Sequence, residues 1–120
     1  ANPAHAPYGR AAREALQSAG AWEAVQARLV LGENVAQAAQ FATTGNATAG
    51  IFAYALTFSA EVSSKGTFTL IPEDSHAPLK QRMALVRGAS EAARDFYRYL
   101  QTPATHSILL RHGFGVPERP

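Results

Sequence analysis

The sequence predicts an α/β fold, on the strength of three observations. Alanine-rich segments with apolar residues at helical spacing alternate with short apolar segments that are typical of strands. One of these short segments is apolar on both faces, as in the centre of a parallel sheet. The chain of 120 residues is 47% hydrophobic and 17% charged, which indicates a folded domain.

Two helices are predicted in the first half of the chain. The first begins near Pro7, after a loop rich in proline and small residues, and a left-handed Gly20 ends it. Trp22 is expected to pack against this helix beneath a short second turn. Asn34 can cap the next helix, which carries alanines at helical spacing and ends at Gly45.

Four short apolar segments are predicted to be strands. The second of them is the one that is apolar on both faces, and the third alternates between apolar and polar residues. The four segments are 28–31, 49–54, 67–71 and 82–86.

The last third of the chain predicts a break followed by two helices. The segment 72–78 begins and ends with proline and breaks regular structure. Ser90 can cap a helix that continues to Leu100, and a final helix runs from Pro103 to about Arg111 before Gly113.

Composition and spacing argue against several classes of function. The net charge of +2 is spread along the chain without a basic block, so nucleic-acid binding is not expected. The absence of cysteine excludes disulfides, thiolate metal sites and cysteine nucleophiles. No apolar run approaches the length of about 18 residues that spans a bilayer, and any export signal is expected upstream of Ala1. No nucleophile, base and orienting group converge, so the protein is not expected to be an enzyme. The spacing of the four histidines indicates no metal site; they are His5, His76, His106 and His112.

Two predicted helix starts, at Tyr8 and at Val35, are candidate anion sites. The first amides of a helix have no partner within it, and the helix dipole adds about half a positive charge there. In a parallel sheet both starts would emerge at the carboxyl ends of the strands, where ligands of open α/β sheets bind.

The residues around these two starts resemble the molybdate-binding proteins of ABC importers. The similar stretches are NPAHAPYGRAA at 2–12 and GENVAQA at 32–38, followed by 45–47, 49–50, 69–72 and LRHGFGVP at 110–117. They extend over nearly the whole chain in the order and spacing of that family.

The resemblance implies one lobe of a type II periplasmic binding protein together with its C-terminal return segment. Residues 1–71 would be part of the second lobe, 72–78 a crossing segment, and 79–120 the return segment that packs on the first lobe. The N-terminal half of the same protein would then be missing from this chain, and an isolated fragment is expected to bind its ligand more weakly. The exposed apolar surface left behind favours a dimer of the fragment.

The resemblance also implies a ligand, partners and site residues. The ligand would be molybdate or tungstate, with no cofactor, bound in the periplasm and delivered to an ABC permease of the inner membrane. The backbone amides of Tyr8 and Val35 would contact the oxyanion. They would be metal contacts only because the oxyanion contains molybdenum or tungsten. Some members add a tyrosine hydroxyl, but Ala53 takes that position here, with Tyr54 one place later.

A site built of donors suits molybdate, which is deprotonated near neutral pH and accepts hydrogen bonds only. Phosphate usually retains a proton and would also need an acceptor. Sulfate is chemically the nearest rival, and the size of the pocket would have to exclude it. Glu33 is the one nearby acid, and we interpret it as a residue that favours the helix start.

An alternative is the effector-sensing domain of a transcriptional regulator with a related lobed fold. A helix-turn-helix upstream of this chain would favour the regulator, whereas an export signal would favour the receptor.

Overall fold

The helices of the first half begin and end at the predicted residues. We describe residues 1–116 from a computed structural model of the chain. Helix α1 spans Pro7–Ser18, with proline at its first position, and Gly20 follows with a positive φ of 67°. Helix α3 spans Val35–Thr43, and Gly45 follows with a φ of 81°. Both predicted helices are therefore confirmed, because proline, glycine and capping residues act through local backbone geometry.

Two short helical turns connect α1 to the segment before α3. Helix α2 spans Trp22–Val25 and the 3-10 helix η1 spans Gln26–Arg28. The guanidinium of Arg13 lies 5.0 Å from the centre of the Trp22 ring, a cation–π contact between α1 and α2. This contact places Trp22 against α1, as the sequence predicts.

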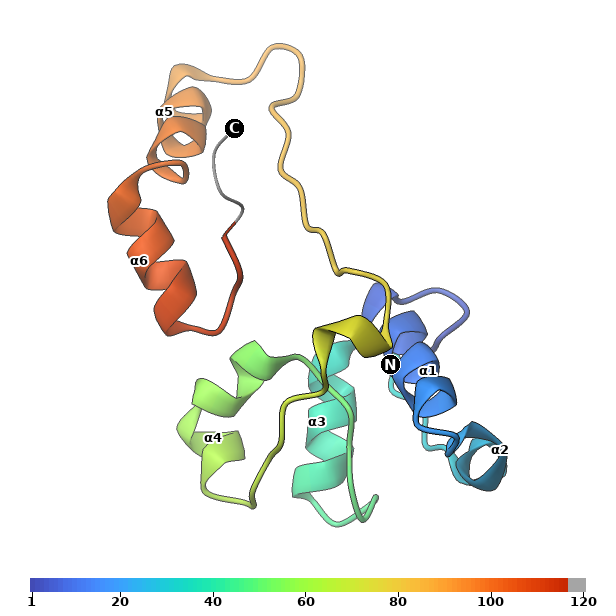
Figure 1. Ribbon diagram of the computed structural model, residues 1–120. Helices are drawn as coiled ribbons and strands as arrows, with labels where there is room; N and C mark the ends of the chain where they lie inside the picture. Colours follow the sequence, from blue (N-terminus) through green and yellow to red (C-terminus); the bar gives the residue numbers. More distant parts are fainter. Residues whose placement is uncertain (117–120) are drawn as a thin grey trace. The chain divides into compact units, whose positions relative to one another are not determined.

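Three further short elements follow α3 in the first part of the chain. They are the 3-10 helix η2 (Tyr54–Phe58), helix α4 (Ala60–Ser63) and the 3-10 helix η3 (Glu73–Ser75). The side chain of Glu14 accepts a hydrogen bond of 2.7 Å from the amide of Ala77, so the segment after η3 is tied back to α1. Figure 1 shows η3 beside α1 and α3.

The chain divides into two compact units, the first ending at Lys80 and the second beginning at Gln81. The second unit holds helix α5 (Glu91–Tyr99) and helix α6 (Pro103–Arg111). Ser90 caps α5 and Gly113, with a φ of 78°, follows α6, as predicted. Pro117 of the C-terminal motif and the end of the predicted return segment, 117–120, lie outside the described residues.

The four predicted strands are not present in residues 1–116, so the α/β class is not confirmed by the structure. The first segment begins at the last residue of η1 and the second ends at the first residue of η2, and all four lie largely outside helices. A strand needs a neighbour about 4.8 Å away that completes its ladder of hydrogen bonds. Apolar patterning indicates which residues could be buried in a sheet, but it does not supply that neighbour.

The buried residues of the described chain are small. The core alanines are exposed by 8% or less, and large apolar side chains remain open to solvent, including Val86 at 75% and Leu70 at 57%. Many large apolar side chains are thus uncovered within residues 1–116. No helix of this described part is long and apolar enough to span a membrane. The buried residues are Gly9, Ala11, Ala15, Gly32, Ala39, Ala53, Thr57 and Thr105.

Candidate oxyanion site

The first candidate donor, Tyr8, lies in the first turn of α1. Ala6 precedes the helix with an extended backbone and supplies no side-chain cap. The carbonyl of Ala6 accepts the first helical hydrogen bond, from Arg10 N at 3.0 Å. Tyr8 is therefore the second residue of a helix of 12 residues, at the positive end of the helix dipole.

The second candidate donor, Val35, is the first residue of α3. The Asn34 side chain accepts a hydrogen bond of 2.9 Å from Gln37 N, and the Gln37 side chain accepts one of 2.8 Å from Glu33 N. This reciprocal pair is a variant of the capping box. It occupies the amides of Glu33 and Gln37. The amides of Val35 and Ala36 have no acceptor among residues 1–116.

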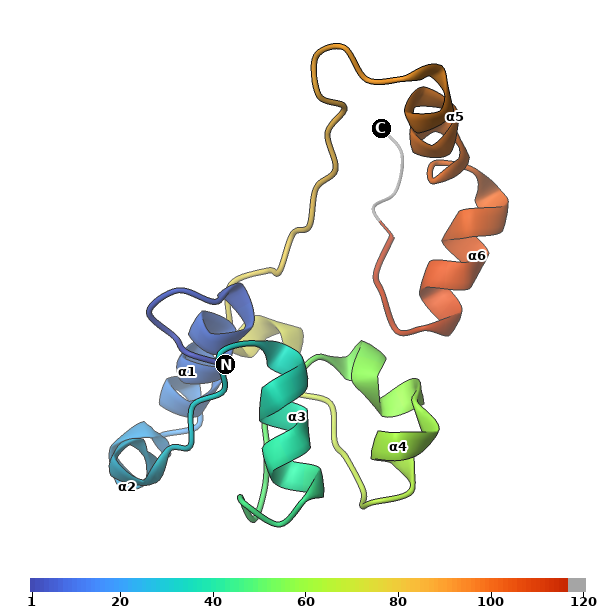
Figure 2. The ribbon, with the colours of Figure 1, turned by 180° about the vertical axis from the view of Figure 1, so that it is seen from behind.

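A short chain of backbone hydrogen bonds links the two helix starts. Asn2 N donates to Gly32 O at 3.0 Å, and Asn2 O accepts from Ala6 N at 2.9 Å. We call this link, from Gly32 through Asn2 to Ala6, the Asn2 bridge. Ala6 directly precedes α1, and Gly32 lies just before the cap of α3. The N-terminus accordingly lies between α1 and α3 in both views (Figures 1 and 2).

Neither the Asn2 bridge nor the capping role of Gln37 was predicted from the sequence. The spacing of Asn34 and Gln37 is that of a capping box and could have indicated the pairing. The Asn2 bridge has no such signature, because it joins backbone atoms of residues that are 30 positions apart.

Ala53 and Tyr54 are placed differently from each other. Ala53 is buried, at 8% exposure, and immediately precedes η2. Tyr54 begins η2, and its ring packs against Phe58 and Phe68 with ring centres 4.9 Å and 5.7 Å apart. Ala53 thus contributes a buried methyl group, while the Tyr54 ring joins a separate aromatic cluster.

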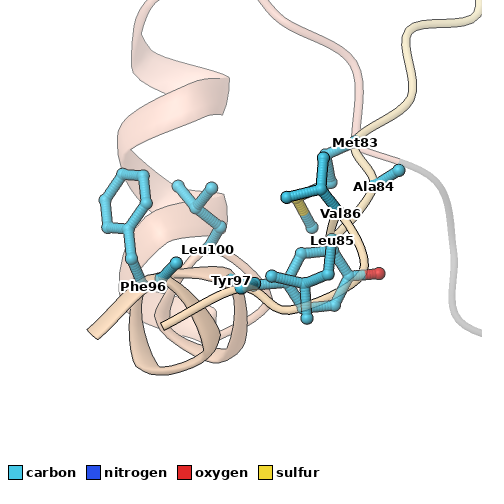
Figure 3. Close-up of a pocket in the computed structure, with 9 residues that line it drawn as sticks. Met83, Ala84, Leu85, Val86, Phe96, Tyr97 and Leu100 are labelled. Carbon is cyan, nitrogen blue, oxygen red and sulfur yellow. The ribbon is translucent and has the colours of Figure 1, made fainter. Parts of the chain in front are cut away.

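The second unit contains an apolar hollow of about 240 Å³ that does not have the chemistry of an anion site. Figure 3 shows Leu85 and Val86 on one side of it and Leu100 on the other, with the Tyr97 ring reaching toward Leu85. Nearly all the side chains around it are apolar, and an oxyanion there would lose its hydration without gaining enough donors. Its lining comes from the extended segment before α5 and from α5 itself.

Carboxylate and imidazole groups are scattered over the described chain. Residues 1–116 contain no group of three histidine, aspartate or glutamate side chains arranged to hold a metal ion. At the start of α3, the amides of Val35 and Ala36 can donate backbone hydrogen bonds to an anion.

The chain matches a known family over nearly its whole length. The family model for bacterial extracellular solute-binding proteins matches residues 1–115. The chain belongs to this family. Among curated relatives of this solute-binding protein, the molybdate-binding protein ModA of Rhodobacter capsulatus is 36% identical over 116 residues, 95% of the chain and 45% of the relative.

Two further relatives agree with this assignment. The molybdate-binding protein ModA of Azotobacter vinelandii is 35% identical over 97% of the chain and 47% of its own length. The ModA protein of Escherichia coli is 36% identical over 96% of the chain and 44% of its own length. The chain thus spans about half the length of the curated relatives it matches. No solved structure gave a significant match.

Proposed function

We propose that this solute-binding protein binds molybdate or tungstate for delivery to an ABC importer. The observation that carries the proposal is the match of nearly the whole chain to relatives named as molybdate-binding proteins, at 35–36% identity. The match includes both helix starts, so the residues of the candidate site lie within the region of similarity. The family name and the names of these relatives support binding as the function, without catalysis.

The proposed site uses the backbone amides of Tyr8 and Val35. Helix dipoles directed at a doubly charged anion stabilise it at both starts. The pairing of Asn34 with Gln37 supports Val35 as a donor. It occupies the amides of Glu33 and Gln37 and leaves the amide of Val35 available. A set of donors without an acceptor favours a fully deprotonated oxyanion over hydrogen phosphate.

The proposed architecture is one lobe of a type II binding protein with its return segment. Residues 1–71 belong to the second lobe, 72–78 cross between lobes, and 79–120 pack on the first lobe. In this arrangement an opening portion of the second lobe would supply the neighbouring strands that the extended segments of residues 1–71 lack, and the first lobe would cover apolar side chains of the return segment. The chain covers 44–47% of the length of these relatives, which leaves room in them for a further lobe.

The proposed location is the periplasm, and the proposed partner is the ABC permease of the inner membrane. The family description as extracellular supports a location outside the cytoplasm. Nothing in the relatives supports the regulator with a DNA-binding module, and nothing supports a dimer.

A comparison of anions tests the proposal directly. The melting temperature of the whole protein, with both lobes, is measured with sodium molybdate, sodium tungstate, sodium sulfate and sodium phosphate at equal concentration and ionic strength. A ligand that binds the folded state stabilises it by an amount that grows with the logarithm of the ligand concentration divided by the dissociation constant, so at equal concentration a tighter ligand raises the melting temperature more. We expect molybdate and tungstate to raise it more than sulfate or phosphate do. Equal shifts with all four anions would contradict the proposed selectivity, and no shift with molybdate would contradict the function.

A further inference from the structure

Two glycines, Gly32 within the Asn2 bridge and Gly9 beside it, permit close contact between backbone segments because they lack a side chain. A β-carbon added at Gly9, in the first turn of α1, would lie 2.5 Å from Ala1 O and 2.6 Å from Asn2 O. A β-carbon added at Gly32 would lie 2.8 Å from Ala38 N and 3.0 Å from Asn34 O. Both glycines are buried.

These contacts hold the two helix starts through rigid atoms. Real β-carbons essentially never approach another heavy atom within 3.0 Å, and the atoms named here belong to the backbone. A flexible side chain could move aside, but backbone atoms move only with the turn that contains them. Gly9 therefore sets how closely the segment of Asn2 lies on α1, and Gly32 sets how closely the preceding loop lies on α3.

We infer that Asn2, Gly9 and Gly32 are positioning residues of the oxyanion site, which fix the spacing between the starts of α1 and α3. The inference rests on the proposed function, because it assigns these residues to the site formed by Tyr8 and Val35. None of the three needs to contact the ligand. Their role is to keep two groups of amides at the separation that one small anion requires.

The physical reason lies in the geometry of the hydrogen bond. A small tetrahedral anion cannot follow its donors if they separate, and a hydrogen bond weakens steeply as its distance and angle depart from their optimum. An added methyl group at Gly9 or Gly32 must displace the backbone by several tenths of an ångström, because the contacts at both sites are shorter than 3.0 Å. A small shift at the Asn2 bridge therefore changes the position of every donor on one side of the anion.

The test compares four glycine-to-alanine variants of the whole protein. Gly9→Ala and Gly32→Ala alter the Asn2 bridge. Gly50→Ala is the packing control, because its β-carbon would lie 2.9 Å from the Ala42 side chain, near the opposite end of α3. Gly66→Ala is the open-space control, since no atom lies within 4 Å of the added carbon. The dissociation constant for sodium molybdate is measured by calorimetry, well below the melting temperature of each variant.

We expect Gly9→Ala and Gly32→Ala to weaken molybdate binding by about tenfold or more, the effect of losing one good hydrogen bond to an anion. Gly50→Ala should lower the melting temperature without a comparable loss of affinity, and Gly66→Ala should change neither. If the bridge variants fail to fold, Asn2→Pro removes the amide that donates to Gly32, and Asn2→Ala keeps it as the matched control. Asn2→Pro should then bind at least tenfold more weakly than Asn2→Ala.

The outcomes separate this inference from the function on which it rests. An unaltered protein that does not bind molybdate would overturn the proposed function. An unaltered protein that binds molybdate, with bridge variants whose dissociation constants equal that of Gly66→Ala, would overturn the positioning role alone. An equal loss of affinity in Gly50→Ala and Gly32→Ala would also overturn it, because any disturbed packing would then have the same effect.

Discussion

Replacing Val35 with proline should weaken molybdate binding while leaving α3 in place. Proline removes the amide hydrogen of this residue and little else, because the first position of a helix needs no hydrogen bond and accepts the fixed φ of proline. Helices α1 and α6 already begin with proline. Asn34, with a φ of −140° and a ψ of 175°, has the extended backbone that a residue before proline prefers.

The expected magnitude follows from the loss of one hydrogen bond to a charged group. Such a bond contributes about 1.5–3 kcal/mol, which corresponds to a change in dissociation constant of about ten- to a hundredfold. The stability of the unliganded protein should change little, because Val35 N has no acceptor among residues 1–116.

The assay is titration calorimetry with sodium molybdate, supported by thermal unfolding of each unliganded variant. Val35→Ala is the matched control, since it shortens the half-buried side chain and keeps the amide hydrogen. Equal dissociation constants for Val35→Pro and Val35→Ala, with both proteins folded, would refute the role of this amide as a donor.

Three further predictions concern stability and the extent of the site. The Thr105 hydroxyl donates to the carbonyl of Tyr99 at 2.9 Å, so Thr105→Val, which keeps the shape of the side chain, should destabilise the protein by about 1 kcal/mol in chemical denaturation; an unchanged stability would exclude a contribution from this bond. A double-mutant cycle on Arg13→Ala and Trp22→Leu should give a coupling of about 0.5–1 kcal/mol, and additive effects would contradict the cation–π contact. The 120-residue chain alone should bind molybdate far more weakly than a protein that carries both lobes, and nanomolar affinity of the chain alone in calorimetry would disprove this expectation.

The positions of the helices could be predicted because their signals are local. Asn34 and Ser90 accept hydrogen bonds from amides three residues later, and this geometry depends on neighbouring residues only. Gly20 and Gly45 have positive φ values, which glycine adopts without strain. For these features the nearby sequence contains the whole physical cause.

The strands and the link between the helix starts depend on distant partners. The segment 49–54 has the apolar pattern of a central strand, but it leads into a 3-10 helix at Tyr54. Its pattern indicates burial in a sheet, and a sheet requires adjacent strands. Likewise, no local signal indicates that Asn2 would donate to Gly32. The candidate donors could be predicted from capping and resemblance, whereas their spatial relation required the structure.

The alanine core has a consequence for experiments that scan the chain by substitution. Because the buried apolar side chains of residues 1–116 are single methyl groups, truncation to alanine would leave these positions untouched and report little about them. Enlarging Ala11 or Ala39 to leucine would instead force the surrounding backbone apart, at a cost of about 1–3 kcal/mol. A survey that enlarges side chains would therefore detect contacts that a survey that shortens them would miss.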